Sequence, residues 1–484
     1  MSRYPYHTSP VLDEQLARLN EEGWQQAVVS QLPPDWEGAA YQHEAYVRDR
    51  EVQGAAQLLR AVLAYVLASF SFAQLGAWAV LLGLPNLSAT AWRKRLRQCH
   101  GWLWWLLREL LTPNQAVVAL VPNAAQIRRI QLIDTTRLKE PGGSGDDYRV
   151  HLAYDLLSGR FSQISLSDCH GAESFSRFDW QAGDVAVGDS GYGYRSCVSL
   201  LSRLGAFAVV RISPRSFPLL QEDGTPLDTL RWLNELPQGI HERVVGFDFH
   251  GQRYEARLIA KSLSAEHAER KRAAKRKLAS KKGRHLKDET LFLCGWIVLI
   301  CTVPRGVWSA QEVLVLSQAR WQIELLFKRM KQLLRLCQLR GKTQLTNEVT
   351  ILACLLSWAL MDQQVSQVRE LLGTLYAPQE PHGQEPGEPE EDHAGEGLAE
   401  PSPHALTPLS EWTLSVVALH TLRVAVLGVW TVERVQQCLP HVQRHLRSSP
   451  RQRRHQRHRI LAWLSQETRS QPEVSSLLFN CSGA

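Results

Sequence analysis

Three acidic residues occupy positions where a carboxylate is costly. Asp134 lies within the apolar run "IQLIDTT", and Asp189 ends the apolar run "DVAVGD". Glu324 is the one acid in a row of bases along residues 318–336, a segment with helical periodicity. A carboxylate in or beside an apolar segment lowers stability unless a cation or hydrogen bonds compensate its charge. These positions therefore predict a shared cation site.

The types of donor indicate which cation would bind. Neither histidine nor cysteine accompanies the three acids at ligand spacing, and the nine cysteines stand singly without a CxxC pair. Such oxygen donors favour Mg²⁺ or Mn²⁺ over Zn²⁺. Two such ions about 4 Å apart can activate water and stabilise a leaving 3′-oxygen. The predicted chemistry is therefore phosphodiester cleavage with Mg²⁺, for which Mn²⁺ can substitute.

Glu324 shares its helix with three bases. At 100° per residue, Arg320, Glu324, Lys328 and Lys331 fall within an arc of about 80° that borders the apolar face. This arrangement would place Glu324 where a packed helix meets solvent. An ordinary Glu–Lys pair on a solvated helix surface explains the pattern equally well.

The elements that must position these acids are short strands. Three strand-like runs, "RRIQLIDTTRL", "YRVHLAYDLL" and "FSQISLSD", are separated by turn sequences and predict hairpins. Strand and helix then alternate through "GDVAVGDSGYGY", "RSCVSLLSRLGA" and "FAVVRIS", which predicts parallel pairing. If the first and fourth strands are neighbours, Asp134 and Asp189 emerge at one edge of the sheet.

The remaining segments suggest an α/β core with helical flanks. Residues 126–213 and 291–376 form the two parts of the predicted core, and residues 214–290 form an insertion with a hairpin and a basic helix. Residues 1–125 are predicted to be a helical DNA-binding domain. Residues 377–407 are acidic, rich in Pro and Gly, and predicted to be a disordered linker. Residues 408–484 are predicted to be helical and basic.

Two features of the N-terminal region admit alternatives. Residues 61–84 carry no charge and are long enough to span a bilayer, but Ser71 as an N-cap favours two buried helices. Ser88 caps a following helix that exposes Arg93, Lys94, Arg95 and Arg97 and buries Trp92 and Leu96. This pattern is similar to a helix-turn-helix, although a solvated basic helix would look the same.

Positive charge is concentrated in two segments although the net charge is only +7. Residues 270–287 contain ten Lys or Arg and no acid, and residues 444–459 contain seven Arg. Blocks of like charge repel one another unless an anion neutralises them. The polyphosphate backbone of a nucleic acid is the usual anion, so we expect a nucleic acid as the partner.

The order of these elements resembles the DDE transposases of the insertion-sequence-four family, which have a ribonuclease-H-like core. The resemblance runs from "LSATAWRKRLRQ" to about residue 360. The family signature around its glutamate is Tyr, two residues, Arg, three residues, Glu, six residues, Lys. Arg320, Glu324 and Lys331 match this spacing, and Ser317 stands at the tyrosine position.

The resemblance implies roles for individual residues. Asp134, Asp189 and Glu324 would be the catalytic triad and the metal ligands, while Arg320 and Lys331 would hold phosphates of the transposon end. Trp296 would stack on a base flipped out of the duplex, although a buried core tryptophan is equally compatible with its strand. Further expected DNA contacts are Lys328, Tyr192, Arg211, Arg93, Lys94 and Arg97.

The expected function is therefore cut-and-paste transposition by a bacterial-type enzyme. Such an enzyme would bind transposon ends and target DNA as a homodimer in a synaptic complex. The N-terminus lacks the features of a signal peptide, so we expect a cytoplasmic, nucleoid-associated protein without a membrane segment. The alternative is a transposase-derived DNA-binding protein that no longer cleaves.

Overall fold

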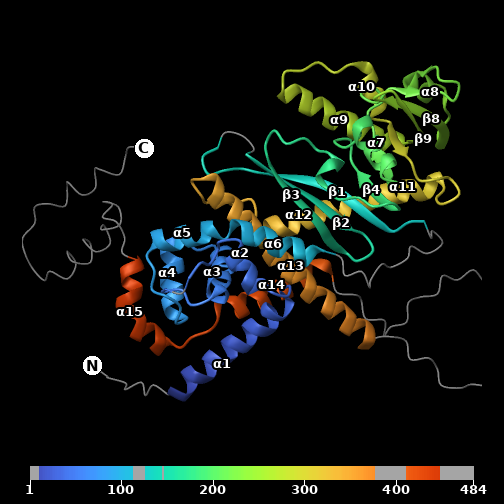
Figure 1. Cartoon of the computed structure of the whole chain (residues 1–484). Coiled ribbons are helices and arrows are strands. Elements are labelled where there is room, and N and C mark those ends of the chain that lie inside the picture. Colours follow the sequence, from blue (N-terminus) through green and yellow to red (C-terminus); the bar gives the residue numbers. More distant parts are fainter. Residues whose placement is uncertain (1–9, 49, 113–125, 144–146, 376–409, 447–484) are drawn as a thin grey trace, which may run out of the picture.

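The computed structural model describes residues 10–48, 50–112, 126–143, 147–375 and 410–446. A mixed β-sheet lies at the centre, the helices from both ends of the chain lie on one side, and the insertion lies at one end (Figure 1). The predicted acidic linker at 377–407 lies outside the described residues, as does most of the arginine-rich segment at 444–459.

The sheet has ten strands in the order β3-β2-β1-β4-β5-β10-β9-β8-β6-β7. Strands β1 (Arg129–Leu138), β2 (Tyr148–Asp155) and β3 (Arg160–Asp168) are connected antiparallel neighbours. Strand β4 (Asp184–Gly188) pairs in parallel with both β1 and β5 (Phe207–Arg211). The predicted hairpins are confirmed, as is the ribonuclease-H-like mixed sheet with helical flanks. The first and fourth strands are neighbours, which is the condition under which the sequence places Asp134 and Asp189 at one edge.

The insertion continues this sheet. It comprises β6 (Leu219–Leu220), β7 (Pro226–Leu227), α8 (Thr229–Glu235), β8 (Ile240–Phe249), β9 (Gln252–Ser262), α9 (Ala265–Lys281) and α10 (Asp288–Leu293). Strand β10 (Trp296–Cys301) pairs antiparallel with β9 on one side and β5 on the other. The predicted hairpin and basic helix are present, and the hairpin is joined to the core by main-chain hydrogen bonds.

The two faces of the sheet pack against different cores, because successive side chains of a strand point to opposite faces. Leu132 and Val187 belong to a core shared with the helices of the two chain ends. Ile133 and Ala186 belong to the opposite core. That second core includes residues of η3 (Phe175–Arg177), α7 (Arg195–Arg203) and the insertion. Both faces of the central strands are therefore buried.

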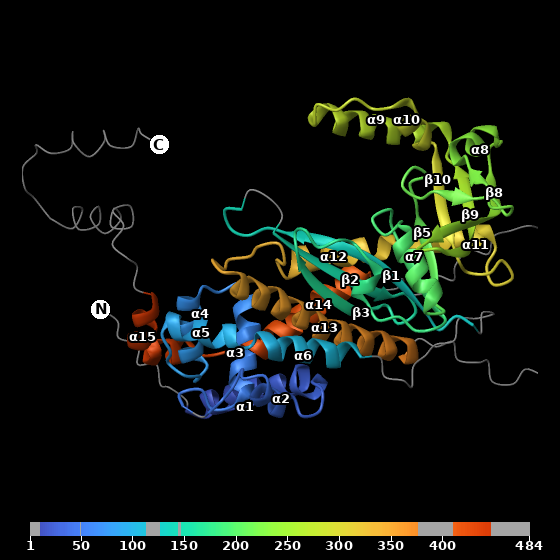
Figure 2. The same ribbon diagram turned by 45° about the horizontal axis from the view of Figure 1, so that its top comes forward.

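The helices from the two ends of the chain lie side by side (Figures 1 and 2). The N-terminal helices are α1 (Pro10–Ala27), η1 (Val29–Gln31), α2 (Trp36–Gln42), α3 (Ala55–Leu67), α4 (Phe72–Leu81), α5 (Ala89–Gln98) and α6 (His100–Leu111). The later helices are α11 (Ala310–Ala319), α12 (Trp321–Leu333), α13 (Gln344–Leu375), α14 (Glu411–Leu427) and α15 (Val432–Leu446). Since α13 packs against α3, α6 and α14, the described parts of the two predicted flanking regions share one core.

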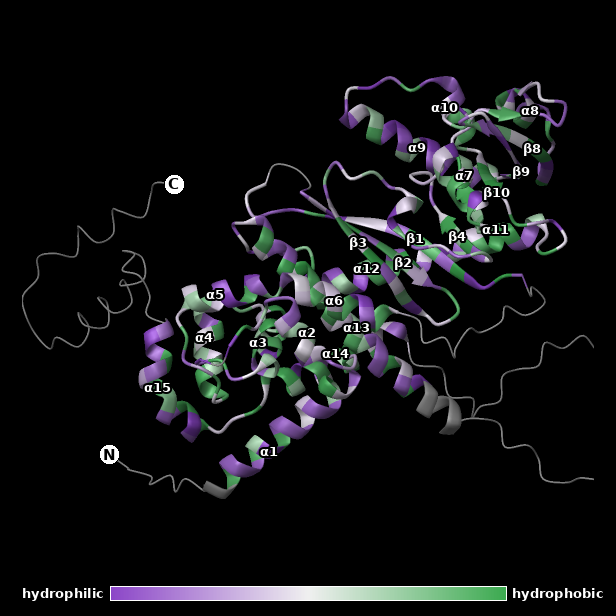
Figure 3. Cartoon of the chain, in the orientation of Figure 1, coloured by the Kyte–Doolittle hydropathy of each residue, from purple (hydrophilic) through white to green (hydrophobic). Residues whose placement is uncertain are grey.

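The uncharged N-terminal stretch forms two short helices, as predicted. Ser71 caps α4 by accepting from the Gln74 amide, and the Gln74 side chain accepts from the Ser71 amide in return. Figure 3 shows α3 and α4 as largely hydrophobic ribbons within the helical part of the molecule. One helix segment in the described residues, Gln344–Arg369, is long and apolar enough to cross a bilayer, and 78% of its apolar 18-residue window is buried inside the protein. That burial is typical of a core helix.

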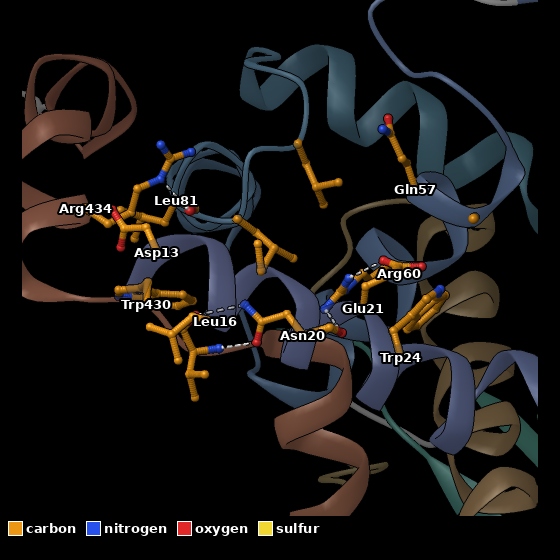
Figure 4. Close-up of a pocket in the computed structure, with 15 residues that line it drawn as sticks. Asp13, Leu16, Asn20, Glu21, Trp24, Gln57, Arg60, Leu81, Trp430 and Arg434 are labelled. Carbon is orange, nitrogen blue, oxygen red and sulfur yellow. Dashed lines mark hydrogen bonds and ion pairs between the residues drawn. The ribbon is translucent and has the colours of Figure 1, made fainter. Parts of the chain in front are cut away.

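Arg60 of α3 connects the two ends of the chain. Its guanidinium donates to the carbonyls of Ala425 and Val426 in α14 and lies 5.2 Å from the ring centroid of Trp24. Burial lowers the pKa of Arg60 to about 10. Beside it is a pocket of about 410 Å³, lined by α1, α3 and the segment that connects α14 with α15 (Figure 4).

A buried ion pair fastens β1 to β4 at the end opposite the candidate site. Asp184 is fully buried, and its carboxylate accepts from Arg128 and Arg129 at distances of 2.8 to 2.9 Å. We expect Asp184→Ala to lower the free energy of unfolding by about 3 kcal/mol or more, because it leaves two partly buried cations without their partner. Chemical denaturation would measure this loss. A wild-type unfolding midpoint would contradict it.

Candidate active site

Asp134 and Asp189 lie at the carboxyl ends of neighbouring parallel strands. The pairing of β1 with β4 ends at Leu132 and Val187, so Asp134 on β1 and Asp189 after β4 each lie two residues beyond it. The amide of Thr135 donates to Asp134 Oδ1 at 2.7 Å, and the amide of Gly191 donates to Asp189 Oδ1 at 2.8 Å. The sequence-based expectation that both aspartates emerge at one sheet edge is met by this register.

Helix α12 brings Glu324 to the same edge. It packs against β1 and buries Ile323, Leu326, Phe327 and Met330, while a third of the Glu324 side chain remains exposed. The segment 318–336, predicted to be one helix, is divided between α11 and α12 at Arg320. Helix α12 stops before Arg335, whose φ of 54° lies in the left-handed region that cannot continue a helix.

Arg320 joins two of the three acids. Its Nη1 lies 3.2 Å from Asp134 Oδ2, and its Nη2 lies 2.5 Å from Glu324 Oε1. Within the described residues, no three acid, histidine or cysteine side chains are arranged so that they could hold one metal ion. The carboxylates therefore need a rearrangement, in which Arg320 leaves Asp134 and Glu324, before they can act as a common ligand set.

The electrostatics of the site favour binding of a cation. Burial, with a smaller contribution from the charges of Asp189 and Glu324, raises the pKa of Asp134 to about 6, although the Thr135 amide and Arg320 act to lower it. One guanidinium thus compensates a cluster of mutually repelling carboxylates. Hard oxygen donors from three separate elements fit Mg²⁺ or Mn²⁺ by their chemistry.

The glycines of the "GDSGYG" sequence allow close approaches that a side chain would prevent. A Cβ on Gly191 would lie 1.8 Å from Glu173 Oε2 and 3.0 Å from Asp189 Oδ1. A Cβ on Gly193 would lie 2.4 Å from the carbonyl oxygen of Arg211. The loop after β4 therefore lies tightly against the end of β5, with Glu173 as a fourth acid beside Asp189. The sequence patterns gave no sign of Glu173.

Several predicted phosphate contacts surround the three acids. Lys328 is exposed and Lys331 half-buried on α12. Partial desolvation and the charge of Arg320 lower the pKa of Arg211, while Asp189 raises it, so Arg211 lies near both residues. Lys271 of α9 extends this row, because desolvation and the charge of Arg211 lower its pKa. Sequence reasoning counted Lys271 in a basic run but could not place it near the site.

Two predicted DNA contacts are buried, which corrects their assignment. Tyr192 is 0% exposed and stacks on Phe175, with ring centroids 5.0 Å apart. Trp296 is 8% exposed and belongs to the core between the sheet and the insertion. Neither ring is presented to DNA in this structure, because both are needed to fill apolar cores.

The helix predicted to follow the N-terminal turn, in a pattern similar to a helix-turn-helix, is α5, and Ser88 caps it as expected. Trp92 and Leu96 are buried, and Arg93 and Lys94 are exposed. Arg97 differs from the expectation, since its guanidinium donates to Thr343 Oγ1 at 2.7 Å and its side chain is half-buried. Arg93 and Lys94 are therefore the predicted contacts on α5 that remain open to a partner.

This fold and edge define a class of protein. A ribonuclease-H-like mixed sheet with two aspartates at the ends of adjacent parallel strands, and a glutamate on the helix packed across them, is the frame of an enzyme that cleaves and transfers nucleic-acid strands. Comparison with known proteins agrees with this class. Residues 126–360 match the family model for the transposase DDE domain.

Curated relatives narrow the class to a family. The putative transposase InsL of insertion sequence element IS186A from Escherichia coli (strain K12) is 34% identical over 340 residues, which are 68% of this chain and 90% of that protein. The transposase of IS421 from Escherichia coli has the same identity and coverage. The transposase of IS231D from Bacillus thuringiensis subsp. finitimus is 23% identical over 282 residues, which are 51% of this chain and 58% of that transposase. The chain belongs to the DDE transposases of the insertion-sequence-four family.

Proposed function

We propose that this protein binds the terminal inverted repeats of an insertion sequence and catalyses DNA cleavage and strand transfer by a cut-and-paste route. The observation that carries the proposal is the convergence of Asp134, Asp189 and Glu324 at one sheet edge from β1, the loop after β4, and α12. The names of the relatives, all transposases of insertion sequences, support the same activity.

In this proposal Asp134, Asp189 and Glu324 hold the divalent ions, Mg²⁺ or Mn²⁺. When bound, these ions would activate the attacking water or 3′-hydroxyl and stabilise the leaving 3′-oxygen. The carboxylates can take up this role only when Arg320 releases Asp134 and Glu324. The freed guanidinium, with Lys331 and Lys328 on the same helix, is then available to bind phosphates of the transposon end.

The remaining partners follow from the charge of the surface. Arg211 and α9 would extend the phosphate-binding row away from the acids, and Arg93 and Lys94 of α5 would contact DNA elsewhere. We propose that two copies act together in a synaptic complex, because two transposon ends must be cut and joined. Because the proposed activity requires access to chromosomal DNA, we also propose a bacterial cytoplasmic, nucleoid-associated location.

The test uses purified protein and DNA that carries the inverted repeats flanking its coding sequence. We expect Mg²⁺-dependent cleavage at the ends, which Asp189→Asn and Glu324→Gln abolish while end binding persists. Glu255→Ala, which removes an exposed acid of β9, should leave cleavage unchanged. A gel assay of end cleavage, with a binding assay in parallel, measures both properties.

The same experiment separates the alternative function. Full cleavage by either variant would remove that residue from the proposed triad. End-specific binding by the wild-type protein without cleavage, in both Mg²⁺ and Mn²⁺, would favour a DNA-binding protein that has lost its catalytic activity. The ion pairs of Arg320 to Asp134 and Glu324 are the observation that keeps this alternative open.

A further inference from the structure

A partly buried chain of side-chain hydrogen bonds crosses the sheet behind the candidate triad. Thr135 Oγ1 lies 2.9 Å from the Tyr192 hydroxyl and 3.0 Å from His151 Nδ1. On the other side of the imidazole, His151 Nε2 lies 2.9 Å from Ser167 Oγ. His151 and Tyr192 are both 0% exposed. These hydrogen bonds thus link β1, β2 and β3 with the loop that follows β4.

The direction of each hydrogen bond follows from the donors available. Ser167 Oγ donates to the carbonyl of Asp168, so it accepts from His151 Nε2–H. Burial lowers the pKa of His151 to about 3, and the neutral ring has only this one N–H. His151 Nδ1 therefore accepts from the Thr135 hydroxyl, and Thr135 Oγ1 accepts from the Tyr192 hydroxyl. Every member of the chain is satisfied in one consistent direction.

Thr135 and Tyr192, at one end of this series of hydrogen bonds, connect the two aspartates of the site. Thr135 donates its amide N–H to Asp134 Oδ1 at 2.7 Å, and the amide of Tyr192 donates to the carbonyl of Asp189 at 3.1 Å. The Tyr192 ring is fixed from behind, since it stacks on Phe175 with an interplanar angle of 16°. A Cβ on Gly188 would lie 3.0 Å from Tyr192 Cβ and 3.2 Å from Phe175 Cζ, so a side chain there would press on the stacked rings.

We propose that Thr135 and Tyr192 are positioning residues whose mutual hydrogen bond sets the separation of the Asp134 and Asp189 carboxylates. The β1–β4 ladder ends before either aspartate, so no main-chain pairing between these strands fixes that distance. The side-chain bond does so from the buried side. The inference rests on the proposed function, because it assigns these residues to the shell that supports the proposed metal ligands.

The test measures Mn²⁺ affinity of the full chain by EPR titration, with thermal unfolding as a check on folding. Thr135→Val removes the hydroxyl and leaves Tyr192 and His151 without their partner. We expect Mn²⁺ binding to weaken by about 10- to 100-fold, as for other residues that support metal ligands. Thr135→Ser, which keeps a hydroxyl, should restore most of the affinity. Tyr192→Phe keeps the stacked ring and should weaken binding to a smaller extent.

A matched control is Thr350→Val, which removes a hydroxyl that donates to the Thr346 carbonyl within α13. It should bind Mn²⁺ as the wild type does. Wild-type affinity in folded Thr135→Val would overturn the inference, as would Thr135→Ser that binds no better than Thr135→Val. If Thr135→Val does not fold, the Mn²⁺ affinity of Tyr192→Phe is the deciding measurement. Wild-type affinity in folded Tyr192→Phe would then overturn the inference.

Asp134→Ala distinguishes this failure from that of the proposed function. Loss of Mn²⁺ binding in Asp134→Ala beside full binding in Thr135→Val would refute the positioning role alone. Full binding in Asp134→Ala would refute the metal site and, with it, the positioning role.

Discussion

Asp134→Asn is expected to lower the rate of end cleavage by a factor on the order of 10³ or more, as is usual for the loss of a central catalytic group. Asp134 lies close enough to both other acids for their charges to affect it, because Asp189 and Glu324 each raise its pKa. An asparagine keeps the shape of the side chain but carries no negative charge for a cation. The measurement is Mg²⁺-dependent cleavage of a transposon-end duplex under single-turnover conditions.

The same substitution should stabilise the fold at neutral pH. The pKa of Asp134 rises from its ordinary 3.8 to about 6 in the folded protein, chiefly through burial. The folded state therefore binds this proton more tightly than the unfolded chain does. Stability from this group is fully present below pH about 4 and is lost as the pH rises through about 6. We expect Asp134→Asn to raise the free energy of unfolding by about 1 to 3 kcal/mol at pH 7.5 and to change it little at pH 4.

Denaturation curves at the two pH values would test this trade between stability and activity. Asp248→Asn, at an exposed ion pair with Arg253 on the insertion hairpin, is the control and should change neither cleavage nor the pH profile. Retention of cleavage by Asp134→Asn would remove it from the triad. Equal stability changes at pH 4 and 7.5 would show that burial does not perturb this carboxyl.

Neutralising the basic helix α9 is the second change with a large expected effect. Lys275, Lys277, Lys281 and Lys282 are exposed and, among the described residues, have no ion pair. Figures 1 and 2 show α9 projecting from the insertion, with the sheet between it and the helices of the two chain ends. Its residue Lys271 lies near Arg211, which in turn lies near Arg320. Helix α9 therefore continues a row of basic side chains, Arg320, Arg211 and Lys271, that leads away from the three acids.

Changing these four lysines to glutamine should reduce the salt dependence of DNA binding. If each contacts a phosphate, the slope of log K against log salt falls by about 3 to 4, since each contact contributes about 0.9. Between 50 and 200 mM salt, this difference corresponds to a change in affinity of roughly 100-fold. Helix propensity is nearly the same for the two residue types, so α9 should persist.

The control for this variant replaces the same four lysines with arginine, which keeps the charge. Fluorescence anisotropy of a labelled end duplex across a salt series measures both slopes. An unchanged slope in the glutamine variant would show that α9 is a solvated arm without contacts to DNA. A reduced slope in the arginine variant would indicate that the shape of the lysine side chain matters more than its charge.

Much of the fold could be predicted from local sequence features. The turn sequences between strand-like runs placed β1, β2 and β3, and the serines that cap α4 and α5 were recognised from residue type and spacing. The turn and capping signals are local, so a single chain carries them in full. The neighbouring positions of Asp134 and Asp189 depended on the pairing of β1 with β4, which no local signal specified.

The environment of each side chain could not be predicted in the same way. Tyr192 and Arg320 both belong to motifs that suggested DNA contacts, yet Tyr192 is fully buried and Arg320 bridges two acids. Trp296 fills a core to which the insertion hairpin contributes, and it lies on a strand that pairs with β9 of that hairpin. The contact between Arg320 and Asp134 joins residues 186 positions apart, and that between Tyr192 and Thr135 joins residues 57 positions apart. No periodicity of the sequence encodes such approaches.

The sequence by itself determined which residues could do chemistry and which elements carry them, because charge in an apolar run, helix periodicity and turn residues are local properties. Only the tertiary structure decided which carboxylates meet, that Arg320 spans Asp134 and Glu324, and that the Thr135–Tyr192 bond connects β1 to the loop after β4. The physical reason is that long-range strand pairing and core packing choose the neighbours of a side chain, and those neighbours set its charge, exposure and hydrogen bonds.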